Sequence, residues 1–219
     1  MREFETKPTQ TFIKAHSSKL IALAIACVAA ALYLPYLSAA HLFDWDEINF
    51  AECAREMILT KNYTQPQINF QPFYEKPPLF IWFQVLSMKV FGVNEYAARF
   101  PDALCGILTL VTVFFVGKNR TNNTRFGVLW AICFGTSLLP HLYFKSGIID
   151  PWFNFFIFLS VTFLSKTFDT LNFWNSLGAI FFASLFGGLA LLTKGPVALL
   201  MIGLTYSIAY LILNLNKSF

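Results

Sequence analysis

Three acidic residues stand together directly after the first long apolar stretch of the chain. Asp44, Asp46 and Glu47 all lie in the segment FDWDE (43–47). Carboxylates that share a poorly solvated place raise one another's pKa, and a carboxylate with a raised pKa is an effective general base. The solvated start of a loop would also explain these acids, so their spacing alone leaves both interpretations open.

A second candidate group lies in FYEKPP (73–78), where Glu75 and Lys76 precede two prolines. Proline fixes its own φ at about −65° and restricts the residue before it, which here is Lys76. A rigidly held cation at a membrane surface suits the phosphate group of a lipid. The competing interpretation is a turn beside the membrane whose lysine reaches out to the water.

Asp150 and Lys194 complete the candidate residues. Asp150 precedes Pro151 at the start of an apolar segment, and Lys194 stands between two long apolar runs in TKGP (193–196). An acid before a helix-starting proline is also a good N-cap. A lysine costs about 2.5–3.5 kcal/mol at the centre of a membrane helix, so the Gly-Pro turn predicts that Lys194 lies at a helix end. There it would bind an anion or anchor the helix.

The rest of the chain indicates which elements must position these residues. Of 219 residues, 56% are apolar and only 13% are charged, about half of what a soluble domain carries. Several long runs have no charged residue, and roughly 20 such residues in a helix cross the hydrocarbon core. These runs are 20–40, 126–144, 170–193 and 195–216. The composition therefore predicts an all-α integral membrane protein.

We expect about six transmembrane helices. Residues 1–19 are polar and basic and are predicted to form a cytoplasmic tail. A retained first span is preferred to a cleaved signal peptide, because its uncharged run is longer than a signal core and further spans follow. The spans are expected near 20–40, 101–117, 126–144, 150–165, 174–193 and 196–215.

The segment 41–100, between the first two predicted spans, is expected to be a long outer loop that contains interfacial helices. In EINFAECAREMIL (47–59) the apolar residues fall on one helical face, which predicts an amphipathic helix on the bilayer surface. We expect its water-facing side to carry Glu52, Arg55 and Glu56.

The segment PPLFIWFQVLSMKVFG (77–92) is helical in pattern but short. If it crosses the membrane, the basic loop 117–125 lies outside. If it lies in the interface, that loop lies inside, where Lys and Arg are favoured. We therefore predict an interfacial helix. With this topology, Asp150 and Lys194 share one outer face with the long loop.

Two other classes find no support in the sequence. The basic residues do not alternate with aromatic residues as on a nucleic-acid surface, so no nucleic-acid partner is expected. The four cysteines show no paired spacing and no zinc pattern, so no disulfide is expected.

Taken in order, the motifs of the chain resemble those of the GT-C membrane glycosyltransferases. They are DWDEINFAECAREM (44–57), YEKPPLFIW (74–82), FGVNEYAARFPDAL (91–104), IIDPW (148–152) and LLTKGP (191–196). The resemblance runs from about residue 20 to residue 215. It points to the bacterial branch with the 4-amino-4-deoxy-L-arabinose lipid A transferase, which is related to the protein O-mannosyltransferases.

The resemblance implies an integral enzyme of a bacterial inner membrane whose donor is a sugar on a polyprenyl phosphate. The acceptor would be a hydroxyl group of a lipid such as lipid A, of a glycan or of a protein at the outer, periplasmic face. No cofactor is firmly implied, and a divalent metal is left open. The implied residues are Asp46 and Asp150 for catalysis, Lys76 and Lys194 for the donor phosphate, and Asp44, Glu47 and Glu75 in support.

In the implied mechanism, Asp46 is the base, or the orienter of the base, that takes the proton from the acceptor hydroxyl as it attacks the anomeric carbon. Lys76 and Lys194 neutralise the charge that grows on the departing lipid phosphate. A single displacement inverts the anomeric centre.

The chain departs from the family pattern at two points. Asn49 stands where many relatives have an arginine, so one expected cation is missing. Relatives are also much longer, so residues 20–219 are expected to be the N-terminal part of a GT-C transmembrane domain whose C-terminal part is absent. The alternatives are a flippase of lipid-linked sugars and a non-catalytic truncated module. Transporter sites lie at mid-membrane, whereas these charges gather at one face, which favours the enzyme.

Overall fold

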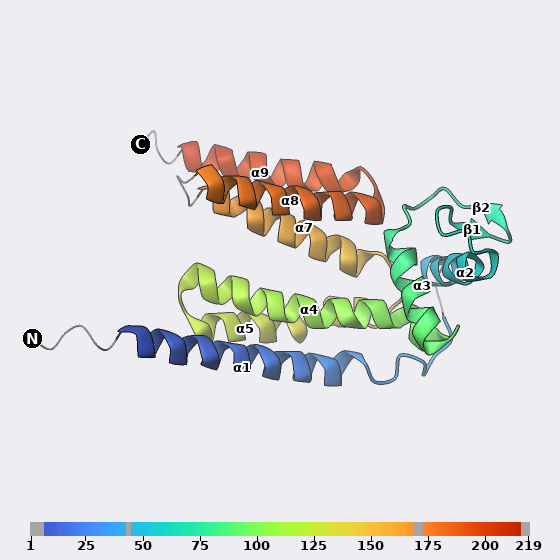
Figure 1. Ribbon diagram of the computed structural model, residues 1–219, viewed down its shortest axis with the longest axis horizontal. Helices are drawn as coiled ribbons and strands as arrows, with labels where there is room; N and C mark the ends of the chain where they lie inside the picture. Colours follow the sequence, from blue (N-terminus) through green and yellow to red (C-terminus); the bar gives the residue numbers. More distant parts are fainter. Residues whose placement is uncertain (1–6, 43–44, 169–172, 216–219) are drawn as a thin grey trace, which may run out of the picture.

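The computed structural model describes residues 7–42, 45–168 and 173–215, and helices dominate these residues (Figure 1). A two-stranded antiparallel hairpin, β1 (Gln67–Ile68) and β2 (Gln71–Pro72), is the sheet in this part of the chain. A 3-10 turn, η1, covers Lys166–Phe168. The α-helices are α1 (Lys7–Tyr33), α2 (Trp45–Thr60), α3 (Leu79–Phe91), α4 (Glu95–Thr121), α5 (Thr124–Gly135), α6 (Leu138–Tyr143), α7 (Asp150–Ser165), α8 (Phe173–Lys194) and α9 (Val197–Leu215).

The long helices form two neighbouring layers. Figure 1 shows α1, α4 and α5 side by side below, and α7, α8 and α9 side by side above. The two layers meet where α4 packs against α7. At one end of this bundle, α2, α3 and the hairpin gather, and α2 and α3 run transverse to the long helices. This transverse course is the one expected for interfacial helices.

Within the part of the chain that the structure describes, two helices are long and apolar enough to cross a membrane. They cover Glu95–Thr121 and Trp174–Lys194. Shorter apolar helical stretches cover Ser17–Tyr33, Leu79–Phe91, Thr124–Gly135 and Val197–Ile212. A 13-residue helix such as α3 is too short to cross the hydrocarbon core, which needs roughly 20 residues.

Asparagine residues set both ends of the turn between α4 and α5. Asn122 ends α4 in the left-handed region (φ 52°), and the side chain of Asn123 accepts hydrogen bonds at the start of α5. The two helices then pack closely, because Gly127 lies against the backbone of α4. A Cβ atom on Gly127 would lie 2.5 Å from the carbonyl oxygen of Phe114. The small residue therefore permits the α4–α5 contact.

The structure replaces the single helix expected over 126–144 by two, because α5 ends at Gly135 and α6 starts at Leu138. Ser137 between them has an extended backbone (φ −68°, ψ 135°). The hydroxyl groups of Thr136 and Ser137 donate to carbonyl groups one turn earlier. Such bonds compete with the helical ladder and favour a helix end. The first helix also differs from expectation, since α1 already begins within the predicted tail.

Candidate active site

The loop after α1 is tied to α4 by a buried ion pair. Arg99 in α4 donates from Nε and Nη2 to the two carboxylate oxygens of Glu47, over 2.7 and 2.9 Å. The same guanidinium donates to three backbone carbonyl groups of the loop, those of Leu37, Ala40 and His41. All five N–H donors of a guanidinium are thereby used. Glu47 is thus part of a buried anchor, and its predicted supporting role in sugar transfer stays a prediction.

Two buried carboxylates hold the loop that leads into α7. The backbone N–H of Gly147 donates to Glu47 over 2.8 Å, and that of Ile148 donates to Asp102 over 2.9 Å. Both carboxylates are buried, at 1% and 0% exposure. Asp150 follows at the start of α7. Glu47 and Asp102 therefore fix the backbone from which the Asp150 side chain extends.

Asp150 and Lys194 form an ion pair across two helices. Lys194 Nζ lies 2.6 Å from a carboxylate oxygen of Asp150, and both side chains are partly exposed. Lys194 is the last residue of α8, and Gly195 turns the chain toward α9 with a φ of +84°. Side-chain atoms of a non-glycine residue disfavour this φ. The structure thus confirms that Lys194 lies at a helix end, and it makes Asp150 its direct partner.

Lys194 faces the Glu75–Lys76 segment across an open cleft of about 420 Å³. Glu75, Lys76 and Pro77 line it on one side, and Lys194 and Gly195 line it on the other. The remaining walls are Thr64, Gln65, Pro66, Phe73, Tyr74 and Pro196. Two lysines that converge on one cleft favour an anionic ligand. The structure therefore brings together four of the predicted residues, since Asp150 joins the cleft through its bond to Lys194.

The loop that carries Lys76 is held by a buried acid of α2. The backbone N–H of Phe70 donates to Glu56 over 2.8 Å, and Glu56 is only 1% exposed. The prediction that Glu56 faces water is therefore wrong. The loop folds back over this side of α2, a long-range contact that the local amphipathic pattern cannot show. Glu52 and Arg55 remain partly exposed and form an ion pair of 2.6 Å.

Helix α3 holds the same loop from the other side. Trp82 donates from its indole nitrogen to the carbonyl oxygen of Tyr63 over 2.6 Å, and Lys89 Nζ lies 4.2 Å from the centre of the Tyr63 ring. Gln65 donates to the hydroxyl oxygen of Tyr74 over 3.0 Å within the cleft wall. Sequence reasoning did not find these residues, although a tryptophan at the start of a predicted interfacial helix is a signal for such an anchor.

Asp46 is less closely connected to the cleft than the other candidate residues Lys76, Asp150 and Lys194. It lies in the first turn of α2, where the helix N-terminus favours an acid. It is half-buried, and its carboxylate has no hydrogen bond or ion pair with residues in the described part of the chain. It is not among the residues that line the cleft. Asp44 lies outside the described residues. The catalytic role of Asp46 stays a prediction.

The titratable groups of α2 differ in their surroundings. Burial raises the pKa of the Cys53 thiol to about 12, with smaller contributions from Glu56 and Glu52. The hydrogen bond from Arg55 lowers the pKa of Glu52. Among the residues that the structure describes, no three His, Cys, Asp or Glu side chains are grouped to hold a metal ion.

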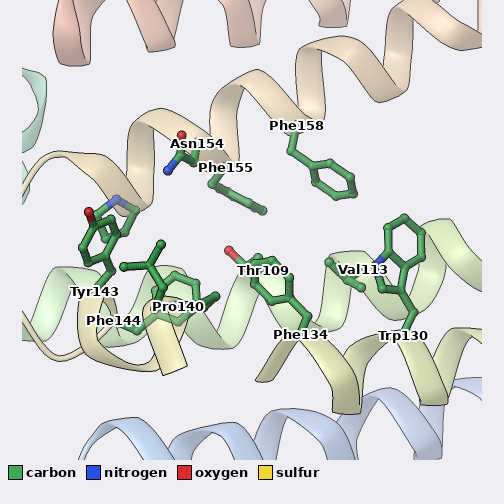
Figure 2. A pocket seen from close by; sticks show the side chains of 12 residues that line it. Thr109, Val113, Trp130, Phe134, Pro140, Tyr143, Phe144, Asn154, Phe155 and Phe158 are labelled. Atoms are coloured by element: carbon green, nitrogen blue, oxygen red, sulfur yellow. The ribbon is translucent and has the colours of Figure 1, made fainter. Parts of the chain in front are cut away.

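An apolar cavity of about 380 Å³ lies between α4, α5, α6 and α7 (Figure 2). Figure 2 shows the rings of Phe134, Phe155, Phe158 and Trp130 along its walls. None of the residues that line it is an Asp, Glu, Lys, Arg or His, so its described walls carry no charged side chain. It reaches Pro151, which directly follows Asp150. The cavity therefore suits a hydrocarbon group close to the cleft.

Comparisons with known proteins agree with these observations. The model of the family described as dolichyl-phosphate-mannose-protein mannosyltransferase matches residues 75–219, about two thirds of the chain. Among similar curated relatives is the undecaprenyl phosphate-alpha-4-amino-4-deoxy-L-arabinose arabinosyl transferase of Yersinia enterocolitica, 26% identical over 85% of this chain and 33% of the relative. Arabinosyl transferase 1 of Pseudomonas fluorescens strain Pf-5 is 28% identical over 80% of this chain and 33% of the relative.

Two crystal structures of ArnT from Cupriavidus metallidurans share the fold. The apo structure matches with a TM-score of 0.75 and 23% identity, over 90% of this chain and 36% of that chain. The structure bound to undecaprenyl phosphate matches with a TM-score of 0.74 and 24% identity, over 87% of this chain and 35% of that chain. The chain thus spans about a third of the length of these relatives. The all-α integral membrane fold of GT-C type is confirmed.

Proposed function

This chain belongs to the dolichyl-phosphate-mannose-protein mannosyltransferase family, and from that membership we propose that it forms part of a membrane glycosyltransferase. The enzyme takes its sugar from a polyprenyl phosphate. The arabinosyl transferases that resemble this chain carry undecaprenyl phosphate-4-amino-4-deoxy-L-arabinose in their names, which supports a donor of this kind. The acceptor is a hydroxyl group of a lipid of the lipid A type, of a glycan or of a protein.

The observation that carries this proposal is the cleft between Lys76 and Lys194. A lipid phosphate needs cations at the membrane surface and an apolar place for its hydrocarbon chain. The cleft supplies two lysines, and the apolar cavity reaches Pro151, next to the Asp150 that pairs with Lys194. Lysine is a common phosphate ligand, and it acts there as a compact charge.

The proposed chemistry is one displacement at the anomeric carbon. The acceptor oxygen forms a bond to this carbon, the bond from the carbon to the phosphate oxygen breaks, and the electron pair leaves with the polyprenyl phosphate. Asp46 takes the proton of the acceptor hydroxyl or orients the group that takes it. Lys76 and Lys194 stabilise the negative charge of the departing phosphate. Asp150 forms an ion pair with Lys194 that partly neutralises this ammonium while the donor is absent, and the displacement inverts the sugar.

We propose a bacterial inner membrane location, with the N-terminus in the cytoplasm and the cleft on the periplasmic side. The orientation is supported by the basic residues at the bundle end opposite the cleft. Lys118, Arg120 and Arg125 lie at the α4–α5 turn, and Lys166 follows α7. Such residues favour the cytoplasmic side of a membrane protein.

Binding of undecaprenyl phosphate to the purified chain tests the cleft. Lys76→Gln and Lys194→Gln are expected to weaken binding by roughly tenfold each, since each removes a charge-assisted contact to phosphate. Lys145→Gln removes the same charge from a residue outside the cleft and is expected to leave the affinity unchanged. If Lys76→Gln and Lys194→Gln bind undecaprenyl phosphate as tightly as Lys145→Gln does, the cleft is not the donor-binding site.

Transfer of a labelled sugar distinguishes an enzyme from a transporter. Membranes that contain the chain are incubated with a labelled polyprenyl-phosphate sugar, and the label is followed into acceptor molecules. Acceptor labelling supports the transferase. Movement of intact donor across the membrane, without cleavage of its sugar bond, supports a flippase instead. Donor binding with neither outcome would identify the chain as a non-catalytic module.

A further inference from the structure

A second polar pocket lies at the bundle end opposite the cleft. It has a volume of about 280 Å³ and is formed by α4 and α7 together with η1. Thr112, Phe115, Val116, Asn119 and Arg120 line it from α4. Leu159, Thr162 and Phe163 from α7, and Lys166 from η1, complete the wall. The proposed donor site does not use any of these residues.

The mouth of this pocket is cationic. Arg120 donates to the hydroxyl oxygen of Ser165, so the guanidinium of α4 reaches across to the end of α7. The ammonium of Lys166 lies 4.4 Å from the centre of the Phe163 ring, on the pocket wall. No Asp or Glu is among the lining residues that the structure describes, and Asp169 lies outside the described residues. Two cations on one rim attract an anion.

The deeper part of the pocket is apolar. Phe115, Val116 and Leu159 stand one or more helical turns further from the helix ends than Arg120 and Lys166. A ligand that fills the whole pocket therefore combines an anionic group with a hydrocarbon part. A free phosphate ion would meet the rim but leave the apolar part empty. Basic pockets between membrane helices bind the headgroups of anionic lipids in this way.

We propose that this pocket binds an anionic glycerophospholipid. The phosphate lies between Arg120 and Lys166, Asn119 and Thr162 offer hydrogen bonds to the headgroup, and one acyl chain follows Phe115 and Leu159. The lipid joins α4 to α7, which are the helices through which the two layers of the bundle meet. The proposal concerns a structural lipid and does not depend on any sugar-transfer activity.

Lipid binding to the purified chain tests this proposal. Phosphatidylglycerol or phosphatidylcholine with the same acyl chains is added to the protein in neutral detergent, and bound lipid is counted by native mass spectrometry. The double variant Arg120→Gln/Lys166→Gln is expected to lose phosphatidylglycerol affinity by roughly tenfold or more. Lys166→Gln alone keeps the bond from Arg120 to Ser165 and is expected to lose roughly threefold to fivefold.

The matched control removes the same charge from the same end of the bundle. Lys19 and Arg125 are both exposed. Lys118, beside the α4–α5 turn, donates to Ser18 of α1, which places Lys19 at the same end of the bundle as Arg125. Lys19→Gln/Arg125→Gln is expected to change the affinity less than twofold. Equal losses in both double variants, or no preference for phosphatidylglycerol in the unchanged protein, would overturn the proposal. Full displacement of the lipid by soluble glycerol phosphate would overturn it too, since that result describes a site for a water-soluble anion.

Discussion

The carboxylate of Glu47 receives two hydrogen bonds from Arg99, and both side chains are buried, at 1% and 3% exposure. The pair joins the start of α2 to the start of α4. Because Glu47 also accepts the N–H of Gly147, one carboxylate fixes three segments that are far apart in the sequence. Glu47 is the direct neighbour of Asp46, and Gly147 lies three residues before Asp150. The pair thus fixes the backbone segments that carry both candidate catalytic acids, Asp46 and Asp150.

Loss of the Glu47 charge is expected to destabilise the fold strongly. Glu47→Gln leaves the Arg99 guanidinium buried without a counter-charge, which typically costs about 3–5 kcal/mol. Thermal unfolding in detergent measures the effect. The matched control is Glu52→Gln, which breaks the partly exposed pair with Arg55 and is expected to cost less than about 1 kcal/mol. Similar losses in the two variants would contradict the anchoring role of Glu47.

Glu56 is expected to control the mobility of the loop that carries Lys76. Glu56→Leu removes the acceptor for the N–H of Phe70, and a hydrogen bond to a charged group typically contributes about 1.5–3 kcal/mol. The loop should then open more often. Cleavage by trypsin after the exposed Lys61 measures this opening, and we expect a rate increase of roughly tenfold. Glu52→Leu on the same helix should leave the rate unchanged, and an equal increase there would exclude a specific contact.

Much of the fold could be predicted because membrane helices leave a local signal. Long uncharged runs indicated the spans, and the helical pattern of residues 77–92 indicated α3. Glu56 shows the limit of this reasoning. Its position on the water side of an amphipathic pattern is local information, whereas its burial results from a contact with Phe70 fourteen residues later. The break between α5 and α6 was missed because serine and threonine in apolar runs are compatible with a continuous helix.

For the candidate site, too, local information could be predicted from the sequence and long-range contacts could not. Motif order placed Lys76, Asp150 and Lys194 in one family pattern. In the structure Lys76 and Lys194 line one cleft, and Asp150 is paired with Lys194. The pairing of Asp150 with Lys194 could not be predicted, because it joins helices whose relative positions depend on the packing of the bundle. Arg99 was visible as an arginine near the start of a span. An ionisable residue there needs a buried partner, and Glu47 supplies it.

The contact between α4 and α5 is expected to tolerate no side chain at Gly127. Gly127→Ala would place a Cβ atom 2.5 Å from a backbone oxygen of Phe114, so the helices must separate. Overpacking of this kind typically costs about 1–3 kcal/mol. Gly178→Ala in α8 is the matched control, because a Cβ atom there meets no atom within 4 Å. Thermal unfolding should show a loss for the first variant and no loss for the second, and equal stability would contradict the close approach.

Cys53 is expected to resist alkylation until the protein unfolds. Burial raises its pKa to about 12, so the protonated thiol dominates at pH 8, and the thiolate is the reactive form. Labelling by iodoacetamide should keep rising from pH 7 to pH 10 instead of levelling near about 8.5, the ordinary thiol pKa. A variant with alanine at Cys27, Cys105 and Cys133 isolates this thiol, and mass spectrometry follows its labelling. Rapid labelling of the folded protein at pH 8 would contradict the burial of Cys53.

Asp150 and Lys194 are expected to have opposite effects on donor binding. Lys194→Gln removes a cation from the cleft and lowers the affinity for undecaprenyl phosphate. Asp150→Asn removes the acid that partly neutralises this cation, so the ammonium becomes available to the phosphate. A partly exposed ion pair is worth about 0.2–1 kcal/mol, and the affinity of Asp150→Asn should therefore rise roughly 1.5-fold to fivefold. Binding titrations of both variants at one ionic strength measure whether the affinity for undecaprenyl phosphate falls in Lys194→Gln and rises in Asp150→Asn. If Asp150→Asn instead loses as much affinity as Lys194→Gln, the acid is needed to orient the lysine toward the phosphate, and its competition with the donor is the weaker effect.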